Sequence, residues 1–165
     1  MGLLGAYMMV DENTLTYLTK LGNEGLHEKI NELEETNELY TIDKLWDGLH
    51  FLLTNVTASS PIENNKLSEA IVGIHVFDTV EAYFIACIEN NELSEIIDAL
   101  EDVSIEELEK EFNPEIFDKK DIYPDIWESS RKDELFEELL NEYNDLLAFY
   151  KKALEMNLHI IFSVF

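Results

Sequence analysis

IDKLWDGLHFLLT, residues 42–54, has the spacing of an amphipathic helix with two contrasting faces. Consecutive residues of a helix are rotated by about 100°, so residues three or four apart share a face. The apolar face, which we expect to be buried, consists of Ile42, Leu45, Leu49, Leu52 and Leu53. The opposite face combines two carboxylates with aromatic, imidazole and hydroxyl groups: Asp43, Trp46, Asp47, His50 and Thr54.

Asp47 and His50 give the polar face a possible chemistry, because a carboxylate three residues before a histidine can orient the imidazole and raise its pKa. In a small hydrolase or transferase, His50 would be the general acid or base and Asp47 its orienting partner. Trp46 would form a stacking wall for a ring-bearing substrate. The same pair is also an ordinary way to satisfy a histidine on a helix, so a purely structural interpretation stands beside the catalytic one.

Three further features extend this candidate site. Thr54 leads into a polar loop that runs to Lys66, which either supplies binding residues or simply connects two helices. His75 lies in an apolar run, where a hydrogen-bonded core histidine is the alternative to a ligand-binding one. Tyr123 precedes Pro124 in an irregular aromatic segment that spans residues 116–127. We therefore list Asp43, Asp47 and His50 as candidate catalytic residues and Trp46, Thr54, His75 and Tyr123 as candidate binding residues.

The charge balance is extreme, with 36 acidic against 11 basic residues and a formal net charge of −25. Such a chain repels phosphate backbones and anionic membrane surfaces, so neither a nucleic acid nor a membrane is the expected partner. A cationic protein would be attracted and its encounter steered electrostatically. The composition favours an interaction module of the inhibitor, immunity-type or adaptor kind, although acidic surfaces also serve solubility alone.

Several signatures of other classes are missing from the sequence. We find no phosphate-binding glycine loop, no zinc spacing, no HExxH and no calcium loop, so no metal or cofactor is expected. Cys87 is the single cysteine, which excludes an internal disulfide and favours a buried, inert thiol. The first residues lack the features of a signal peptide, and no apolar run reaches membrane-spanning length. These features predict a cytoplasmic protein.

A length of 165 residues fits one domain covering residues 1–165. Apolar runs predict strands at 3–10, 74–77, 82–88 and 158–164, with a short extended segment at 39–42. Helical periodicity covers 12–21, 25–35, 42–54, 67–72, 89–102, 104–112 and 132–156. The pattern indicates an α+β domain with a mixed sheet of four to five strands and roughly six surrounding helices. A three-layer α/β/α sandwich is the alternative.

These residues together carry a resemblance to a known family. IDKLWDGLHFLLT, the run LSEAIVGIH at residues 67–75 and the triplet Ile122-Tyr123-Pro124 resemble the YfbM-like family of small bacterial proteins, whose function is unknown. The family pattern has glycine where this chain has Asn55, which bears on the turn after the central helix. The resemblance implies a compact domain with a mixed sheet and surrounding helices, and it brings no established activity.

Overall fold

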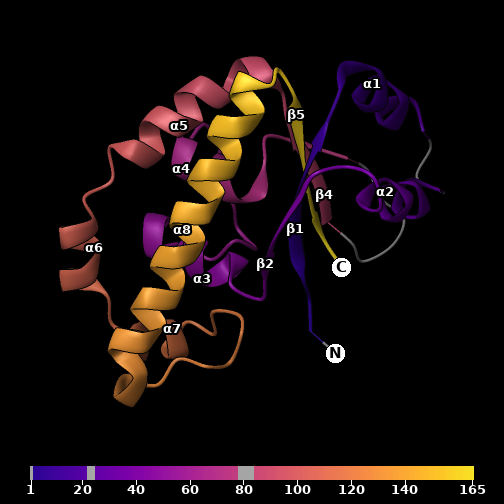
Figure 1. Cartoon of the computed structure of the whole chain (residues 1–165). Coiled ribbons are helices and arrows are strands. Elements are labelled where there is room, and N and C mark those ends of the chain that lie inside the picture. Colours follow the sequence, from indigo (N-terminus) through magenta and orange to yellow (C-terminus); the bar gives the residue numbers. More distant parts are fainter. Residues whose placement is uncertain (1, 22–24, 78–83) are drawn as a thin grey trace.

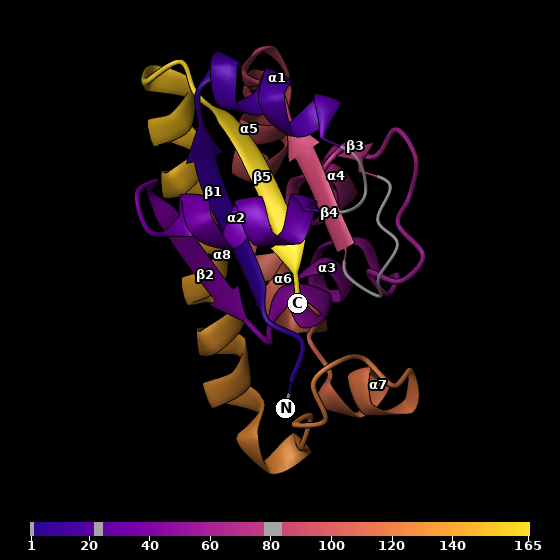
Figure 2. The same ribbon diagram turned by 90° about the vertical axis from the view of Figure 1, so that its right-hand side faces the viewer.

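Both ends of the chain pair side by side in the middle of one five-stranded sheet (Figures 1 and 2). The computed structural model describes residues 2–21, 25–77 and 84–165. The strand order is β2-β1-β5-β4-β3. The strands are β1 (Gly5–Val10), β2 (Leu39–Asp43), β3 (His75–Val76), β4 (Phe84–Ile88) and β5 (His159–Val164). β5, the last element, is thus a central strand, flanked by β1 and β4.

All four strand pairings of the described residues are antiparallel, so the expected mixed sheet is corrected to an antiparallel one. The uninterrupted apolar sequence of β4 is typical of a strand covered on both faces, a property common in parallel sheets. Here both faces are covered by helices although the sheet is antiparallel. Burial on two faces, and not strand direction, accounts for the apolar run.

Helices form a layer on each face of the sheet (Figure 1). On one face lie α1 (Glu12–Lys20) and α2 (Leu26–Glu34). The other face carries α3 (Trp46–Thr54), α4 (Lys66–Val72), α5 (Leu93–Glu101) and α8 (Lys132–Glu155), with α6 (Ile105–Glu111) and α7 (Pro114–Lys119) further out. Two 3₁₀ turns, Asn90–Glu92 and Ser129–Arg131, precede α5 and α8. The α+β class is confirmed, with the three layers of the alternative architecture.

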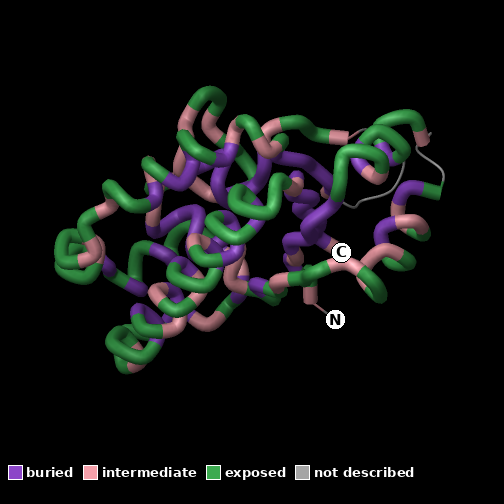
Figure 3. The backbone as a smooth tube through the Cα atoms, turned by 45° about the horizontal axis from the view of Figure 1, so that its top comes forward, coloured by how far each residue is buried: buried purple, intermediate pink, exposed green. Residues whose placement is uncertain are grey.

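Alternating side chains of the sheet supply two separate cores. Tyr7 and Met9 of β1 face the larger helical layer, whereas Met8 and Val10 face α1 and α2. This is the period of two that a strand imposes on its side chains. Figure 3 shows the resulting concentration of buried residues in the middle of the molecule.

The central helix begins later than its periodicity predicts. Ile42 and Asp43 belong to β2, and the helix α3 starts at Trp46. Asp43 has a φ of 54°, a left-handed conformation that aspartate tolerates better than most residues and that no helix continues through. Asp43 therefore does not share a helical face with Trp46 and His50, and this part of the expected polar face is wrong.

The longest helices follow their apolar stripes closely. The stripe of α5, predicted within residues 89–102, is buried at Leu93, Ile96, Ile97 and Leu100. The helix predicted at 132–156 is α8, which lies along the sheet and buries Leu135, Leu139 and Leu146. Residues 82–83 of the strand predicted at 82–88 lie outside the described residues. None of the helices in the described ranges combines the length and apolar composition needed to cross a lipid bilayer.

Candidate functional site

The two ionisable side chains of the central helix lie inside the protein. Asp47 is 3% exposed and His50 is 0% exposed, as buried as the apolar residue Leu49 between them. Helix α3 packs against α4 on one side and α8 on another, and Trp127 covers it at Gly48. A helical wheel cannot reveal this, because it separates polar from apolar residues but says nothing about a second layer over the polar face.

Asp47 binds two segments that are distant from α3 in the sequence. Its Oδ1 accepts hydrogen bonds from the Thr57 hydroxyl at 3.0 Å and the Ala58 backbone N–H at 2.7 Å. Its Oδ2 accepts one from the Tyr123 backbone N–H at 2.9 Å. A buried carboxylate is stable only when such donors surround it. Asp47 therefore fastens both the loop after α3 and the segment after α7 to the central helix.

His50 continues the same network on the other side of the loop. Its Nδ1 lies 2.7 Å from the Val56 carbonyl oxygen, and its Nε2 lies 2.7 Å from the Ser68 hydroxyl. A carbonyl oxygen can only accept, so Nδ1 carries the proton and Nε2 accepts from Ser68. The Ser68 oxygen accepts in turn from the Ile62 N–H at 3.0 Å. Both ring nitrogens are therefore engaged within the protein.

The expected influence of Asp47 on His50 is outweighed by burial. Desolvation lowers the pKa of His50 below its usual 6.5, while the Val56 carbonyl and the Asp47 charge act in the opposite direction. Burial disfavours the charged imidazolium because it removes the water that would solvate it. Asp47 therefore raises the pKa of His50 as expected, but the larger effect of burial makes the net shift downward.

Thr54 and Asn55 shape the turn that leaves the central helix. The Thr54 hydroxyl donates to the His50 carbonyl oxygen at 2.8 Å, which is a local helix-capping contact. Asn55 adopts a φ of 62°, the left-handed conformation that often ends a helix and that favours glycine, with asparagine the next choice. The difference from the glycine of the family pattern thus preserves the turn.

Trp46 and Tyr123 come together and hold the N-terminal segment. Their ring centroids are 5.5 Å apart. The Trp46 indole N–H donates to the Leu3 carbonyl oxygen at 3.2 Å, and the Tyr123 hydroxyl accepts from the Leu3 N–H at 2.8 Å. A Cβ at Gly5 would lie 3.0 Å from the Trp46 ring, so this glycine permits the close approach. The two aromatic residues therefore bind a part of their own chain.

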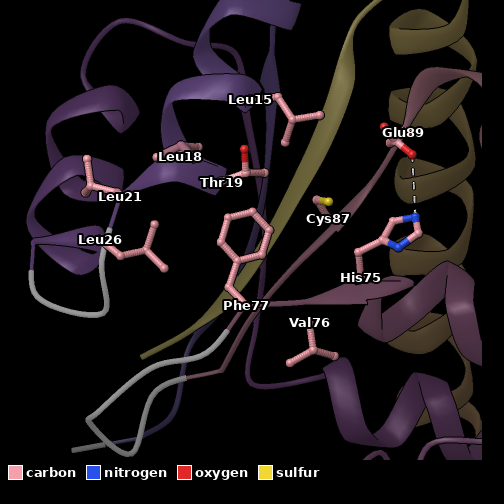
Figure 4. A pocket seen from close by; sticks show the side chains of 10 residues that line it. All are labelled: Leu15, Leu18, Thr19, Leu21, Leu26, His75, Val76, Phe77, Cys87 and Glu89. Atoms are coloured by element: carbon pink, nitrogen blue, oxygen red, sulfur yellow. Dashed lines mark ion pairs between the residues drawn. The ribbon is translucent and has the colours of Figure 1, made fainter.

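His75 lies elsewhere, at the mouth of a pocket of about 500 Å³ between α1, α2 and the edge of the sheet (Figure 4). Leucines of the two helices and Phe77 form its walls, and Cys87 and Glu89 line it together with His75. The imidazole is exposed rather than enclosed in the core. His75 is thus separated from His50 and Asp47, which do not line this pocket, and the candidate residues divide into two places.

Two glutamates that the sequence analysis does not select lie beside His75. Its Nε2 is 2.9 Å from Oε1 of Glu92 and 3.6 Å from Oε2 of Glu89. Glu89 and Glu92 orient each other through a capping box at the start of the 3₁₀ turn before α5. The spacing Glu-x-x-Glu directly after a strand is the signal for that turn. Its meeting with His75 depends on the register of the β3–β4 hairpin, in which His75 pairs with Cys87.

The end of α5, the turn after it and α6 carry a dense acidic surface. We call this surface the acidic segment and define it as residues 98–111. Its exposed carboxylates belong to Asp98, Glu101, Asp102, Glu106, Glu107, Glu109 and Glu111, and its single basic residue is Lys110. Glu101 pairs with Lys151 at 3.2 Å. Across the part of the chain that the structure describes, the other six carboxylates form no ion pair.

Comparison with known proteins places this architecture in a family. The family model described as "Domain of unknown function (DUF1877)" matches residues 1–163. The chain belongs to the DUF1877 family. It is similar to Protein YfbM of Escherichia coli (strain K12), with 29% identity over 162 residues that cover 98% of this chain and 97% of that protein. It is also similar to the crystal structure of YfbM from Escherichia coli, described as a protein of unknown function, with 27% identity and a TM-score of 0.86 over 98% and 99% of the two chains.

For a DUF1877 protein, family membership confirms the resemblance seen in the sequence and leaves the activity open. The family description and the relatives' names carry no substrate, cofactor or partner. Three features of this DUF1877 chain are candidates for a function: the buried Asp47–His50 network, the pocket at His75 and the acidic segment.

Proposed function

We propose that this protein is an interaction module that binds a cationic protein, and that the acidic segment is its contact surface. The observation that carries the proposal is the accumulation of seven exposed carboxylates against one lysine within residues 98–111. Basic side chains elsewhere are partly engaged already: Lys66 pairs with Glu69 and Glu95, and Arg131 pairs with Glu134 and Glu138. The outer helices thus present a negative surface that a positive partner would complement.

The competing interpretation, a hydrolase or transferase centred on His50, has less support. A general acid or base must come within hydrogen-bond reach of a substrate proton. His50 is 0% exposed, and both ring nitrogens are bonded to groups of the protein. Both carboxylate oxygens of Asp47 likewise accept hydrogen bonds from the protein, Oδ1 from the loop after α3 and Oδ2 from the Tyr123 N–H. The burial of this network favours a structural role and leaves the charged exterior as the feature to explain.

The experiment is capture of the partner by tagged protein from its native lysate, followed by washes of rising ionic strength. The screening length falls from about 10 Å at 0.1 M salt to about 3 Å at 1 M, so a contact made by exposed charges should release its partner within this range. We expect one stoichiometric protein of basic isoelectric point in the salt eluate. Capture of neutral or acidic proteins alone, or retention that salt does not affect, would contradict the proposal.

Charge-reversed variants distinguish the contribution of the acidic segment to partner binding from the contribution of the net charge of the protein. Glu106→Lys with Glu109→Lys reverses two exposed carboxylates of α6, and Glu28→Lys with Glu35→Lys reverses two exposed carboxylates in and after α2. Both pairs change the net charge by the same amount. We expect the α6 pair to reduce capture at least about tenfold and the α2 pair to leave it nearly unchanged. Equal loss in both would show that net charge alone matters.

A further inference from the structure

A second site, independent of the acidic segment, is formed where β3 meets the turn after β4. His75 comes from the edge strand, and Glu89 and Glu92 come from the first residues after β4. One ligand atom from each residue can be chosen so that all three lie within 4.8 Å of one another. The three residues offer one imidazole nitrogen and two carboxylate oxygens, which are donor types that divalent transition metals accept.

The distances from His75 to the two glutamates are close to those between neighbouring ligands of a metal ion. Donors at about 2.0–2.2 Å from a tetrahedral Zn²⁺ are about 3.3–3.6 Å apart. The His75 Nε2 lies 2.9 Å from a Glu92 oxygen and 3.6 Å from a Glu89 oxygen. Lengthening the His75–Glu92 separation by a few tenths of an ångström would place both of these pairs in that range. The Glu89 N–H also donates to Oε1 of Glu92 at 2.9 Å, and this hydrogen bond orients the Glu92 carboxylate.

The adjoining pocket contains the side chain of a buried cysteine. Cys87 is 4% exposed and lines the same pocket as His75 and Glu89 (Figure 4). Its thiol forms no disulfide, because Cys87 is the single cysteine of the chain.

We propose that His75, Glu89 and Glu92 bind a divalent transition-metal ion of the zinc class at the mouth of this pocket. Three protein ligands leave a coordination position open for water or a small ligand, the arrangement of reactive rather than closed structural zinc sites. Four leucines, Val76 and Phe77 make up most of the pocket lining, and Cys87 is the one lining residue that carries a soft sulfur donor. The ligands come from two segments, which is why no metal motif is visible in the sequence.

The test is titration of the full, chelator-treated chain with ZnCl₂, followed by calorimetry. We expect saturable binding of one Zn²⁺ per chain, tighter than that of Mg²⁺ or Ca²⁺, because the latter two prefer all-oxygen ligands. His75→Ala and Glu92→Gln should each weaken Zn²⁺ binding at least about 100-fold. Glu92→Gln keeps an oxygen that can accept from the Glu89 N–H, so the turn should remain folded.

The matched control is Asp133→Asn with Glu137→Gln, which removes two exposed carboxylates from α8 and should leave Zn²⁺ affinity unchanged. Far-ultraviolet circular dichroism verifies that each variant is folded, and Glu89→Gln replaces any variant that is not. Visible absorption of Co²⁺ added in place of Zn²⁺ provides a second readout, which should vanish in His75→Ala. Absence of saturable Zn²⁺ binding, equal affinity for Ca²⁺, or equal loss in the α8 control would overturn the proposal.

Discussion

Asp47 and Tyr123 are 76 residues apart in the chain, yet the Tyr123 backbone N–H donates a 2.9 Å hydrogen bond to Oδ2 of Asp47. The bond joins the segment after α7 to the central helix α3. With the bonds from Thr57 and Ala58, it makes one carboxylate the meeting point of three parts of the chain. The polar face of the central helix is thereby explained by architecture.

The first prediction concerns Asp47 itself. Asp47→Ala removes the acceptor of three hydrogen bonds and leaves two buried backbone N–H groups unpaired. We expect a loss of about 3 kcal/mol in the free energy of unfolding, the range of broken buried networks. Urea denaturation measures it, with the exposed Asp125→Ala as a control that should change stability by less than about 0.5 kcal/mol. A loss as small as the control's would mean that Asp47 is not structural.

His50 should make stability depend on pH. Because burial lowers the pKa of His50, the unfolded chain takes up the proton more readily than the folded protein. The neutral imidazole therefore contributes stability that is fully present above about pH 6.5 and is lost as the pH falls toward the folded-state pKa. The difference in unfolding free energy between wild type and His50→Gln should shrink on acidification. A difference that stays constant or grows would contradict the assigned protonation state.

Gly48 should resist substitution because of Trp127. A Cβ at Gly48 would lie 2.6 and 2.7 Å from two carbons of the Trp127 ring. Although alanine favours helices more than glycine does, we expect Gly48→Ala to cost about 1–3 kcal/mol through overpacking. Trp127→Phe replaces the indole by a smaller phenyl ring. In that background, Gly48→Ala should lower the free energy of unfolding by less. A thermodynamic cycle measures this coupling, and purely additive effects would place the clash elsewhere.

The contacts of Leu3 predict a local effect. Tyr123→Phe deletes the hydroxyl that accepts from the Leu3 N–H, and the site is partly exposed, so the cost should stay below about 1 kcal/mol. Amide hydrogen exchange should accelerate at Leu3 and remain unchanged at Tyr7 in the centre of β1. Faster exchange at both positions would indicate that the hydroxyl supports the whole sheet instead.

The sequence predicts helices and their buried faces well where one periodic pattern runs uninterrupted. The stripe of α8 identifies a helix and its buried face because 24 residues repeat the same spacing. The central helix is different, since Ile42 and Asp43 fit its wheel but belong to β2, in which Asp43 pairs with Gly5 of β1. Local periodicity cannot reveal that competition, because strand pairing is a contact between distant residues.

The contacts of the candidate site could not be predicted for the same reason, because they join residues that are distant in the sequence. The sequence singles out Asp47 and His50, but their partners lie in the following loop, in α4 and beyond α7. His75 is also singled out, whereas Glu89 and Glu92 become its neighbours only through the register of a hairpin. Composition indicates an acidic surface, and only the fold shows that the seven carboxylates of residues 98–111 are all exposed.

The most direct test of the proposed function measures affinity between the purified protein and its captured basic partner, by calorimetry at low and high ionic strength. The comparison includes Glu106→Lys with Glu109→Lys and the matched pair Glu28→Lys with Glu35→Lys. We predict that the α6 pair weakens binding at least about tenfold at low salt, that the α2 pair has little effect, and that high salt reduces the difference. Equal affinity of wild type and the α6 pair at low salt would contradict the proposed contact surface.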